Sequence, residues 1–251
     1  MKFSIITPLY NSSEFILSYI SNHLDNEILN NYQIEIIFVD DCSQDNSVEL
    51  LKKYTTNIDN CNIIINKKNS GPGVSRLTGA KNANGEYLIF IDIDDKVNLK
   101  EKVCIQYGMM IDKKYEWSFT QYTINNKNQI RSKLNINNIN QILRHRYIAM
   151  SSVMIKKKLF LSYEKYMYFS SYSCEDYIIW IKLAINNKFP LYVSETNMIY
   201  NISKFGLSKN KIKQALSVFK VYKFLLGFRK SFINFLFYII NKFLNYFSYK
   251  I

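Results

Sequence analysis

Residues 87–95 read YLIFIDIDD, a short apolar run followed by three aspartates. This stretch decides the fold because the chain before it alternates similar strand-like runs with helix-like segments. The other strand-like runs are FSIIT at 3–7, IEIIFV at 34–39 and NIIIN at 62–66, and the helix-like segments lie at 12–25, 47–54 and 74–83. Short apolar strands separated by helices are typical of βαβ units in a sheet covered on both faces. We therefore predict an α/β fold with a mostly parallel central sheet flanked by helices.

Beyond residue 100 the alternation is less regular. We expect a helix over 100–114, strands over 117–124 and 151–155, and a largely buried helix over 175–187. The chain has 251 residues, of which 48% are hydrophobic, enough for one large domain with a substantial core. Only 7 Gly and 3 Pro occur, and no linker-like stretch separates two domains. The sequence predicts one domain over 1–210 and a helical tail over 211–251.

The cysteines and histidines limit the possible chemistry. Four cysteines lie far apart and form no CxxC pair: Cys42, Cys61, Cys104 and Cys174. Because Met1-Lys2 leads directly into the first strand-like run, we expect no signal peptide and reduced thiols in a cytoplasmic protein. Zinc is not expected, since His23 and His145 are the only histidines and no ligand cluster is visible.

The formal net charge of +13 is concentrated in the tail. No acidic residue follows Glu195, whereas ten basic residues do: Lys204, Lys209, Lys211, Lys213, Lys220, Lys223, Arg229, Lys230, Lys242 and Lys250. A basic surface suits nucleic acid or anionic lipid. Bulky aliphatic side chains, rather than exposed stacking residues, dominate the run 231–248, which disfavours nucleic acid.

The tail run 231–248 has a helical pattern. Its polar residues recur at three-, four- and seven-residue intervals: Ser231, Asn234, Asn241, Lys242, Asn245 and Ser248. This spacing predicts an amphipathic helix that lies in the plane of a membrane, flanked by basic residues that meet anionic lipid, rather than a helix that crosses it. The alternative is a helix that packs on the domain or on a second subunit.

The sharpest chemical feature is the acidic end of the run at 87–92. Residues i and i+2 of a strand point to the same side, so Asp92 and Asp94 can converge on one point. Carboxylates brought together repel unless a cation or a proton neutralises them. Mg²⁺ or Mn²⁺ suits such ligands, with phosphate oxygens and water completing its shell. The alternative is that these aspartates cap the following helix.

A second acidic pair, Asp40-Asp41, follows the run 34–39. Ligands of parallel sheets bind beyond the carboxyl ends of the strands, where the polar stretch at 7–11 also lies. Asp40 or Asp41 could accept a hydrogen bond from a base imino group or a ribose hydroxyl, or the pair could only shape its turn.

Two further segments carry candidate residues. The run NSGPGVSR at 69–76 precedes a helix and offers Arg76 to a phosphate or to an aspartate, although by itself a turn and a helix start explain it. Glu175-Asp176 begins the later helix, where an amino terminus favours an ionised carboxylate that can act as a base. An acidic first turn also commonly serves only to offset the helix dipole.

Taken together, the motifs resemble the inverting family-2 glycosyltransferases of the nucleotide-diphospho-sugar transferase fold, of the bacterial surface-polysaccharide type. FSIITPLYN looks like that family's first strand and nucleotide loop, and IIFVDDCSQDNS like its VDDxSxD element. GPGVSRLTGAKNANGEYLIFIDIDD looks like the segment leading into its metal-binding DxD, and CEDYIIWIKLA like its ED-containing helix. Four ordered motifs at family-like spacing are far more specific than any one alone.

The resemblance implies roles for individual residues. It places a donor base and ribose near Pro8, Tyr10, Asp40 and Asp41, with Arg76 supporting the nucleotide. Asp92 and Asp94 would lie at the ribose and at a Mg²⁺ or Mn²⁺ ion, and Asp176 would be the general base. Residues 1–97 would form the nucleotide-binding half and 98–210 the acceptor half.

The implied reaction transfers one sugar from a nucleotide-sugar donor to a lipid-linked saccharide, with inversion of the anomeric configuration. A UDP-sugar is the expected donor. The implied setting is surface polysaccharide assembly, such as O-antigen or capsule, on the inner face of the cell membrane. Some positions depart from the family pattern: Leu77 stands where many relatives have Asn, and Tyr200-Asn201 stands for a common Tyr-Arg element before Gly206-Leu207-Ser208. Two other classes remain open, a sugar nucleotidyltransferase and a catalytically inactive, glycosyltransferase-like binding subunit.

Overall fold

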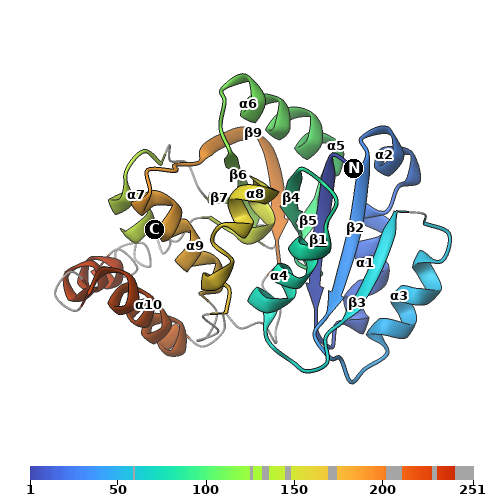
Figure 1. The fold of residues 1–251 in the computed structure, drawn as a ribbon, viewed down its shortest axis with the longest axis horizontal. Helices are drawn as coiled ribbons and strands as arrows, with labels where there is room; N and C mark the ends of the chain where they lie inside the picture. Colours follow the sequence, from blue (N-terminus) through green and yellow to red (C-terminus); the bar gives the residue numbers. More distant parts are fainter. Residues whose placement is uncertain are drawn as a thin grey trace.

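The computed structural model describes residues 1–58, 60–124, 127–131, 136–144, 148–168, 174–201, 211–227 and 231–240. In these ranges the chain forms a mixed sheet with helices on both faces, the α/β fold predicted from the sequence (Figure 1). The sheet order is β3 (Cys61–Ile65), β2 (Ile34–Asp40), β1 (Phe3–Leu9), β4 (Tyr87–Phe90), β8 (Val153–Lys156), β6 (Trp117–Ile124), β9 (Leu191–Tyr200) and β5 (Lys96–Val97), with β7 (Lys127–Arg131) paired to β6.

The sheet is parallel in the first part of the chain and mixed in the second. The parallel pairs are β1 with β2, β2 with β3, β1 with β4, and β6 with β9. Strand β8 runs antiparallel to both β4 and β6, and β5 runs antiparallel to β9. The parallel strands β1, β2 and β4 therefore bring their carboxyl ends to one edge of the sheet, where ligands of such folds bind.

The apolar runs are continuous because both faces of the sheet are covered. Successive residues of β1 point to opposite faces. Ile5 packs in one core cluster with Tyr19 and Phe38, and Ile6 packs in the other with Val39 and Leu77. All of these side chains are buried.

The helices α1 (Ser13–His23), α2 (Asn26–Asn31) and α3 (Ser47–Thr55) contribute to the cluster of Ile5, and α4 (Pro72–Asn82) and α9 (Glu175–Ile185) to that of Ile6. The helix expected over 100–114 is present in three pieces, α5 (Leu99–Glu101), a π-helical turn at Lys102–Gln106 and α6 (Tyr107–Asp112). The remaining short helices are α7 (Ile139–Arg144), Met150–Ser152, α8 (Lys157–Leu161) and Glu164–Tyr166.

The tail begins with α10 (Lys211–Leu226), and residues 231–240 form another helical segment. Figure 1 shows α10 at the opposite end of the molecule from α3. One side of α10 is buried against the domain, and the hydroxyl oxygens of Tyr222 and Tyr177 lie 2.7 Å apart. The part of the predicted tail helix after residue 240, and the Gly206-Leu207-Ser208 element, lie outside the described residues. Among the helices that the structure describes, none is both long and apolar enough to cross a membrane.

Candidate active site

The carboxyl edge of β1 and β2 is built from two interlocked loops. The Asp41 N–H donates to the Leu9 carbonyl at 2.8 Å, which continues the pairing of the two strands. Just beyond β1, the Asn11 N–H donates to Ser43 Oγ at 2.9 Å, and Asn11 has a left-handed φ of 46°. Pro8 is buried within β1, whereas the Tyr10 side chain is 46% exposed at the rim. The loop therefore presents an aromatic ring at the edge where the sequence predicts a base.

The two aspartates that follow β2 differ in what they contact. The Asp41 carboxylate accepts hydrogen bonds from the Gly71 N–H at 2.7 Å, from the Ser70 N–H at 3.0 and 3.1 Å, and from the Asn66 amide at 2.9 Å. It thus fastens the loop before α4. In Asp40, one carboxylate oxygen accepts from the Ser43 N–H at 2.9 Å, and the other is buried with no partner among the described residues. Of the two aspartates, Asp40 has acceptor capacity left.

The start of α4 lies very close to the start of α9. Gly71 has a φ of +87°, a left-handed conformation that glycine adopts without steric cost, and Pro72 then begins the helix. A Cβ atom on Gly73 would lie 2.9 Å from Cγ of Glu175. The glycine-rich run at 69–76 therefore allows two helices to meet and contacts the Asp41 carboxylate.

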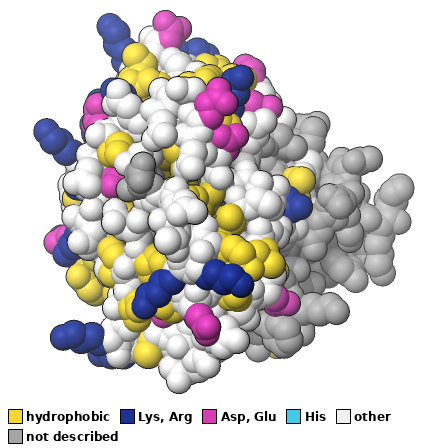
Figure 2. Space-filling view, turned by 90° about the vertical axis from the view of Figure 1, so that its right-hand side faces the viewer, with side chains coloured by type: hydrophobic (Ala, Val, Ile, Leu, Met, Phe, Trp, Pro, Cys, Tyr) yellow, Lys and Arg dark blue, Asp and Glu magenta, His cyan; other side chains and the backbone are white. Residues whose placement is uncertain are grey.

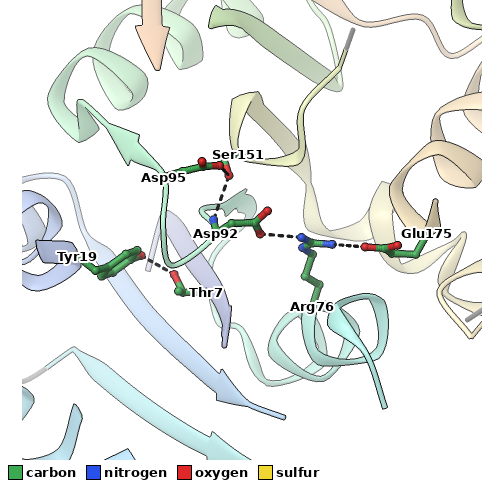
Figure 3. A network of polar contacts seen from close by, with 7 residues as sticks. All are labelled: Thr7, Tyr19, Arg76, Asp92, Asp95, Ser151 and Glu175. Carbon is green, nitrogen blue, oxygen red and sulfur yellow. Dashed lines mark hydrogen bonds and ion pairs between the residues drawn. The ribbon is translucent and has the colours of Figure 1, made fainter. Parts of the chain in front are cut away.

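Arg76 joins three segments of the site (Figure 3). Its side chain, only 5% exposed, reaches from α4 with one terminal nitrogen 2.7 Å from Asp92 Oδ1 and the other 2.9 Å from Glu175 Oε1. Burial acts to lower the pKa of Arg76, but the charges of Asp92 and Glu175 outweigh it and the pKa is raised. The forked guanidinium suits this double role, which a lysine could not fill. Arg76 therefore pairs with an aspartate, one of the two partners proposed for it from the sequence.

The three aspartates after β4 also have different surroundings. Asp95 is 2% exposed, and its carboxylate accepts hydrogen bonds from Ser151 Oγ at 2.6 Å and from the Asn201 N–H at 2.9 Å. Burial, and the charges of Asp92 and Asp94, raise its pKa well above the ordinary value. Asp94 is half-buried, and burial together with the charge of Asp92 raises the pKa of Asp94 to about 6.

This arrangement fits a divalent cation. Within the described part of the chain, no three or more His, Cys, Asp or Glu side chains are gathered in a way that could hold a metal ion by themselves. Mg²⁺ is usually held by one or two carboxylates together with phosphate oxygens and water, so Asp94 beside Asp92 is a suitable donor set. Two carboxylates whose negative charges disfavour each other, as the raised pKa of Asp94 indicates, would be stabilised by a cation.

Asp176 lies in the first turn of α9, next to Glu175, and is half-buried. Asp176 shares its surroundings with two acids of the loop after β4, because the charges of all three act on Tyr200. Burial raises the pKa of Tyr200, and the charges of Asp95, Asp92 and Asp176 raise it further. The residues predicted from four separate motifs thus surround one edge of the sheet.

Residues 92–95, which follow β4, are called the acidic loop. The roles of four site residues were not predicted: Glu175 as the partner of Arg76, Asp95 and Ser151 as partners of each other, and Asn201 as a donor to the acidic loop. Glu175 and Asp95 stand inside quoted motifs, so their acidity was visible but their partners were not. Ser151 was predicted only as part of a strand, and Asn201 was noted only as a departure from a family element.

The model of the family described as Glycosyl transferase family 2 matches residues 4–177, a range that includes Arg76 and every acidic residue of the site described above. The chain belongs to glycosyl transferase family 2. It is therefore a glycosyltransferase, as the resemblance of its motifs implies.

Other comparisons agree with this family-2 assignment. The chain is 26% identical over 212 residues to the Escherichia coli UDP-Glc:alpha-D-GlcNAc-diphosphoundecaprenol beta-1,3-glucosyltransferase WfgD, covering 83% of this chain and 78% of that protein. The share of a curated relative that the chain spans varies widely, from 97% in one to 15% in another.

Two solved structures share the fold of this family-2 enzyme. S. aureus TarS, residues 1–349, in complex with UDP-GlcNAc, superimposes with a TM-score of 0.65 at 20% identity, over 89% of this chain and 67% of that one. The mannosyltransferase PcManGT from Pyrobaculum calidifontis, in complex with GDP-Man and Mn²⁺, gives a TM-score of 0.67 at 12% identity, over 96% and 68%. At these identities the likeness establishes the fold.

Proposed function

We propose that this family-2 glycosyltransferase transfers one sugar from a UDP-sugar to a lipid-linked saccharide, with inversion, during bacterial surface polysaccharide assembly such as that of O-antigen or capsule. The observation that carries the proposal is the meeting of the Asp40 acceptor, the Arg76–Asp92 pair and Asp176 at one sheet edge. The name of WfgD, which specifies a UDP-glucose donor and a diphosphoundecaprenol-linked acceptor, and the TarS complex with UDP-GlcNAc support the donor and acceptor classes.

Donor recognition is assigned to the edge of β1 and β2. Tyr10, half-exposed, offers its ring to the base beside Pro8, and the free Asp40 oxygen accepts the imino N–H of a uracil. Asp41 keeps the loop before α4 in place through its three donors and thereby shapes the pocket. Arg76 orients Asp92, whose remaining oxygen is left for the ribose.

Asp94, with Asp92 beside it, would hold a Mg²⁺ or Mn²⁺ ion, which when bound stabilises the negative charge of the departing nucleoside diphosphate. The PcManGT complex with Mn²⁺ is consistent with this expectation.

Asp176 is assigned as the base. The amino terminus of α9 favours its ionised form. In the proposed step the acceptor oxygen attacks the anomeric carbon, the bond from that carbon to the diphosphate oxygen breaks, and the acceptor proton passes to Asp176. The attack occurs opposite the leaving group in a transition state with oxocarbenium character, so the configuration inverts.

Nucleotide release and binding test the proposed function. The protein is incubated with UDP-, GDP- and dTDP-sugars, with Mg²⁺ or Mn²⁺ and without either, and binding of the free nucleotides is measured by calorimetry. Cation-dependent release or binding with the UDP series is expected. Folded protein that binds none of them would favour the inactive binding subunit, and diphosphate release from a nucleoside triphosphate would favour the sugar nucleotidyltransferase.

We further propose that the tail holds the enzyme on the inner face of the cell membrane. The exposed side of α10 carries Ile212, Leu216 and Phe224 together with Lys220 and Lys223. On 231–240 the exposed side chains are all apolar: Phe232, Ile233, Leu236, Phe237, Ile239 and Ile240. On the face on the α3 side, by contrast, acidic and basic side chains are interspersed with hydrophobic ones (Figure 2).

The sign of the tail's charge argues for anionic lipid over a second copy of the chain. No acidic residue follows Glu195, so two tails packed together would repel, whereas an anionic bilayer would attract them. We expect the protein to sediment with phosphatidylglycerol-containing vesicles and to be released by salt. The double variant Phe232→Ser/Leu236→Ser should lose this binding, and Leu17→Ser, on the distant helix α1, should keep it. A wild-type dimer in solution that the double variant disrupts, without vesicle binding, would assign the face to a subunit contact instead.

A further inference from the structure

The acidic loop has to hold its position without the support of the sheet. The pairing of β4 with β8 ends at Ile89 and Met154, and the last ladder-like bond of β4 is from the Ile91 N–H to the Ile6 carbonyl at 3.2 Å. Asp92 to Asp95 then form a tight turn in which the Asp95 N–H donates to the Asp92 carbonyl at 3.0 Å. Other contacts must therefore set where the Asp92 and Asp94 carboxylates lie.

Ser151 supplies the first of these contacts, from the helical turn Met150–Ser152 that leads into β8, the strand next to β4. Its hydroxyl oxygen accepts a hydrogen bond from the Asp92 N–H at 3.0 Å and donates its own proton to Asp95 Oδ2 at 2.6 Å (Figure 3). Ser151 precedes β8, and continuing the antiparallel register of β4 and β8 brings it alongside Asp92. One hydroxyl thus ties both ends of the turn.

Asn201 supplies the second contact, from the far side. Its backbone N–H donates to Asp95 Oδ1 at 2.9 Å, and its side-chain amide donates to the Asp94 carbonyl. Both oxygens of Asp95 are therefore occupied by protein donors, which separates this residue from Asp92 and Asp94. Asp95 anchors the loop rather than contacting a ligand.

Two buried side chains, Lys102 and Gln106, hold the backbone of the turn that contains Ser151. The buried Lys102 ammonium lies 3.2 Å from the Ser151 carbonyl and 3.0 Å from the Ser152 carbonyl, and the Gln106 amide donates to the Ser152 carbonyl at 3.1 Å. These contacts hold the backbone of the turn independently of the Ser151 hydroxyl. Removing that hydroxyl should therefore free the acidic loop and leave the turn in place.

We propose that Ser151 is a positioning residue: acting through Asp95 and the Asp92 N–H, it holds the Asp92–Asp94 pair in the geometry that takes up a cation and a nucleoside diphosphate. This inference rests on the proposed function for the identity of the ligand. The Ser151 hydroxyl accepts from the Asp92 N–H and donates its only proton to Asp95 Oδ2, so its effect is exerted through the aspartates. Residues that orient metal ligands typically change metal affinity or activity by roughly 10- to 100-fold when they are substituted.

The test compares Ser151→Ala with Ser152→Ala. Ser152 is a matched control because it lies in the same turn, is fully buried and donates its hydroxyl to the Ala149 carbonyl at 2.6 Å rather than to the acidic loop. Amide hydrogen exchange of the peptide spanning 90–97 is measured in the nucleotide-free protein, and UDP binding is measured over a range of Mn²⁺ concentrations. Ser151→Thr, which keeps the hydroxyl, is the rescue variant.

We expect Ser151→Ala to speed exchange at 92–95 and to raise the Mn²⁺ concentration needed for half-maximal UDP binding roughly tenfold. Ser152→Ala should change neither quantity more than about twofold, even if both alanine variants lose similar thermal stability, and Ser151→Thr should restore binding. Faster exchange with an unchanged Mn²⁺ requirement, or equal effects of the two alanine variants on that requirement, would overturn the inference while leaving the proposed function intact. A wild-type protein that binds no nucleotide would overturn both.

Discussion

Replacement of Arg76 by methionine should be strongly destabilising, and the structure gives the size of the effect. Arg76 is 4% exposed and pairs with Asp92 and Glu175, whose side chains are 27% and 14% exposed. Methionine would leave two largely buried carboxylates facing each other without a cation. Breaking a buried ion pair by removing one partner costs about 3–5 kcal/mol. At about 2–4 °C per kcal/mol for a chain of this size, the melting temperature should fall by roughly 6–20 °C.

A double-mutant cycle separates the ion pair from the loss of packing. Thermal and urea unfolding are measured for wild type, Arg76→Met, Glu175→Gln and the double variant. Because the residues are in contact, the two effects should not add, and the coupling should be roughly 0.5–3 kcal/mol. UDP binding by the folded Arg76→Met protein should also weaken, since Asp92 loses its orientation. A melting temperature within about 2 °C of wild type, or a coupling near zero, would refute the reasoning.

Three other substitutions test separate parts of the site. Asp40→Asn should weaken UDP binding by roughly 10- to 100-fold in calorimetry with little loss of stability, because it removes an acceptor oxygen. Asp41→Asn should mainly lower the melting temperature, because the Asp41 carboxylate accepts hydrogen bonds from three residues. The reverse pattern would exchange the roles of the two aspartates. Asp176→Asn should keep donor binding and lower the transfer rate by roughly 100- to 10,000-fold, with the exposed Asp112→Asn as control; near-normal turnover would remove Asp176 as the base. Burial lowers the pKa of His23 to about 4, below its unfolded value of about 6.5. The contribution of His23 to stability is therefore complete above pH 6.5 and is lost as the pH falls toward 4. The urea midpoint of His23→Gln should depend less on pH in this window than that of the wild type, and an equal dependence would show that His23 is not the titrating group.

The sequence predicts the strands β1, β2 and β4 well because of how they are buried. Both faces of β1, β2 and β4 lie in a core, so each appears as a continuous apolar run. In β9 the apolar pattern is interrupted at Ser194 and Glu195, and its pairing with β6 shifts register between Thr120 and Gln121. Strand β5 has only two residues and forms only because β9 lies beside it. These elements depend on tertiary pairing that a local pattern does not contain.

For the candidate site, too, one part is predictable from the sequence and another is not. The acids at the ends of β2 and β4 are predictable, because parallel neighbouring strands end at one edge. The contacts that each acid makes are not predictable. Arg76 and Glu175 are 99 residues apart in the chain, Ser151 and Asp92 are 59 apart, and Asn201 and Asp95 are 106 apart. The sequence therefore indicates which residues gather, and only the folded chain distinguishes Asp40 from Asp41 and Asp95 from Asp94.

The contact between Tyr177 and Tyr222 links the tail to the residue proposed as the base. Tyr177 directly follows Asp176 in α9, and its hydroxyl oxygen lies 2.7 Å from that of Tyr222 in α10. The Tyr222 hydroxyl donates to the Leu143 carbonyl, which leaves the Tyr177 hydroxyl as the donor to Tyr222. If α10 rests on a bilayer as proposed, the height of Asp176 above the lipid surface is set by side-chain packing and not by a free hinge. The enzyme would then select acceptors by length. A saccharide whose growing end lies at that fixed distance from its lipid anchor would be a better acceptor than a shorter or a longer saccharide.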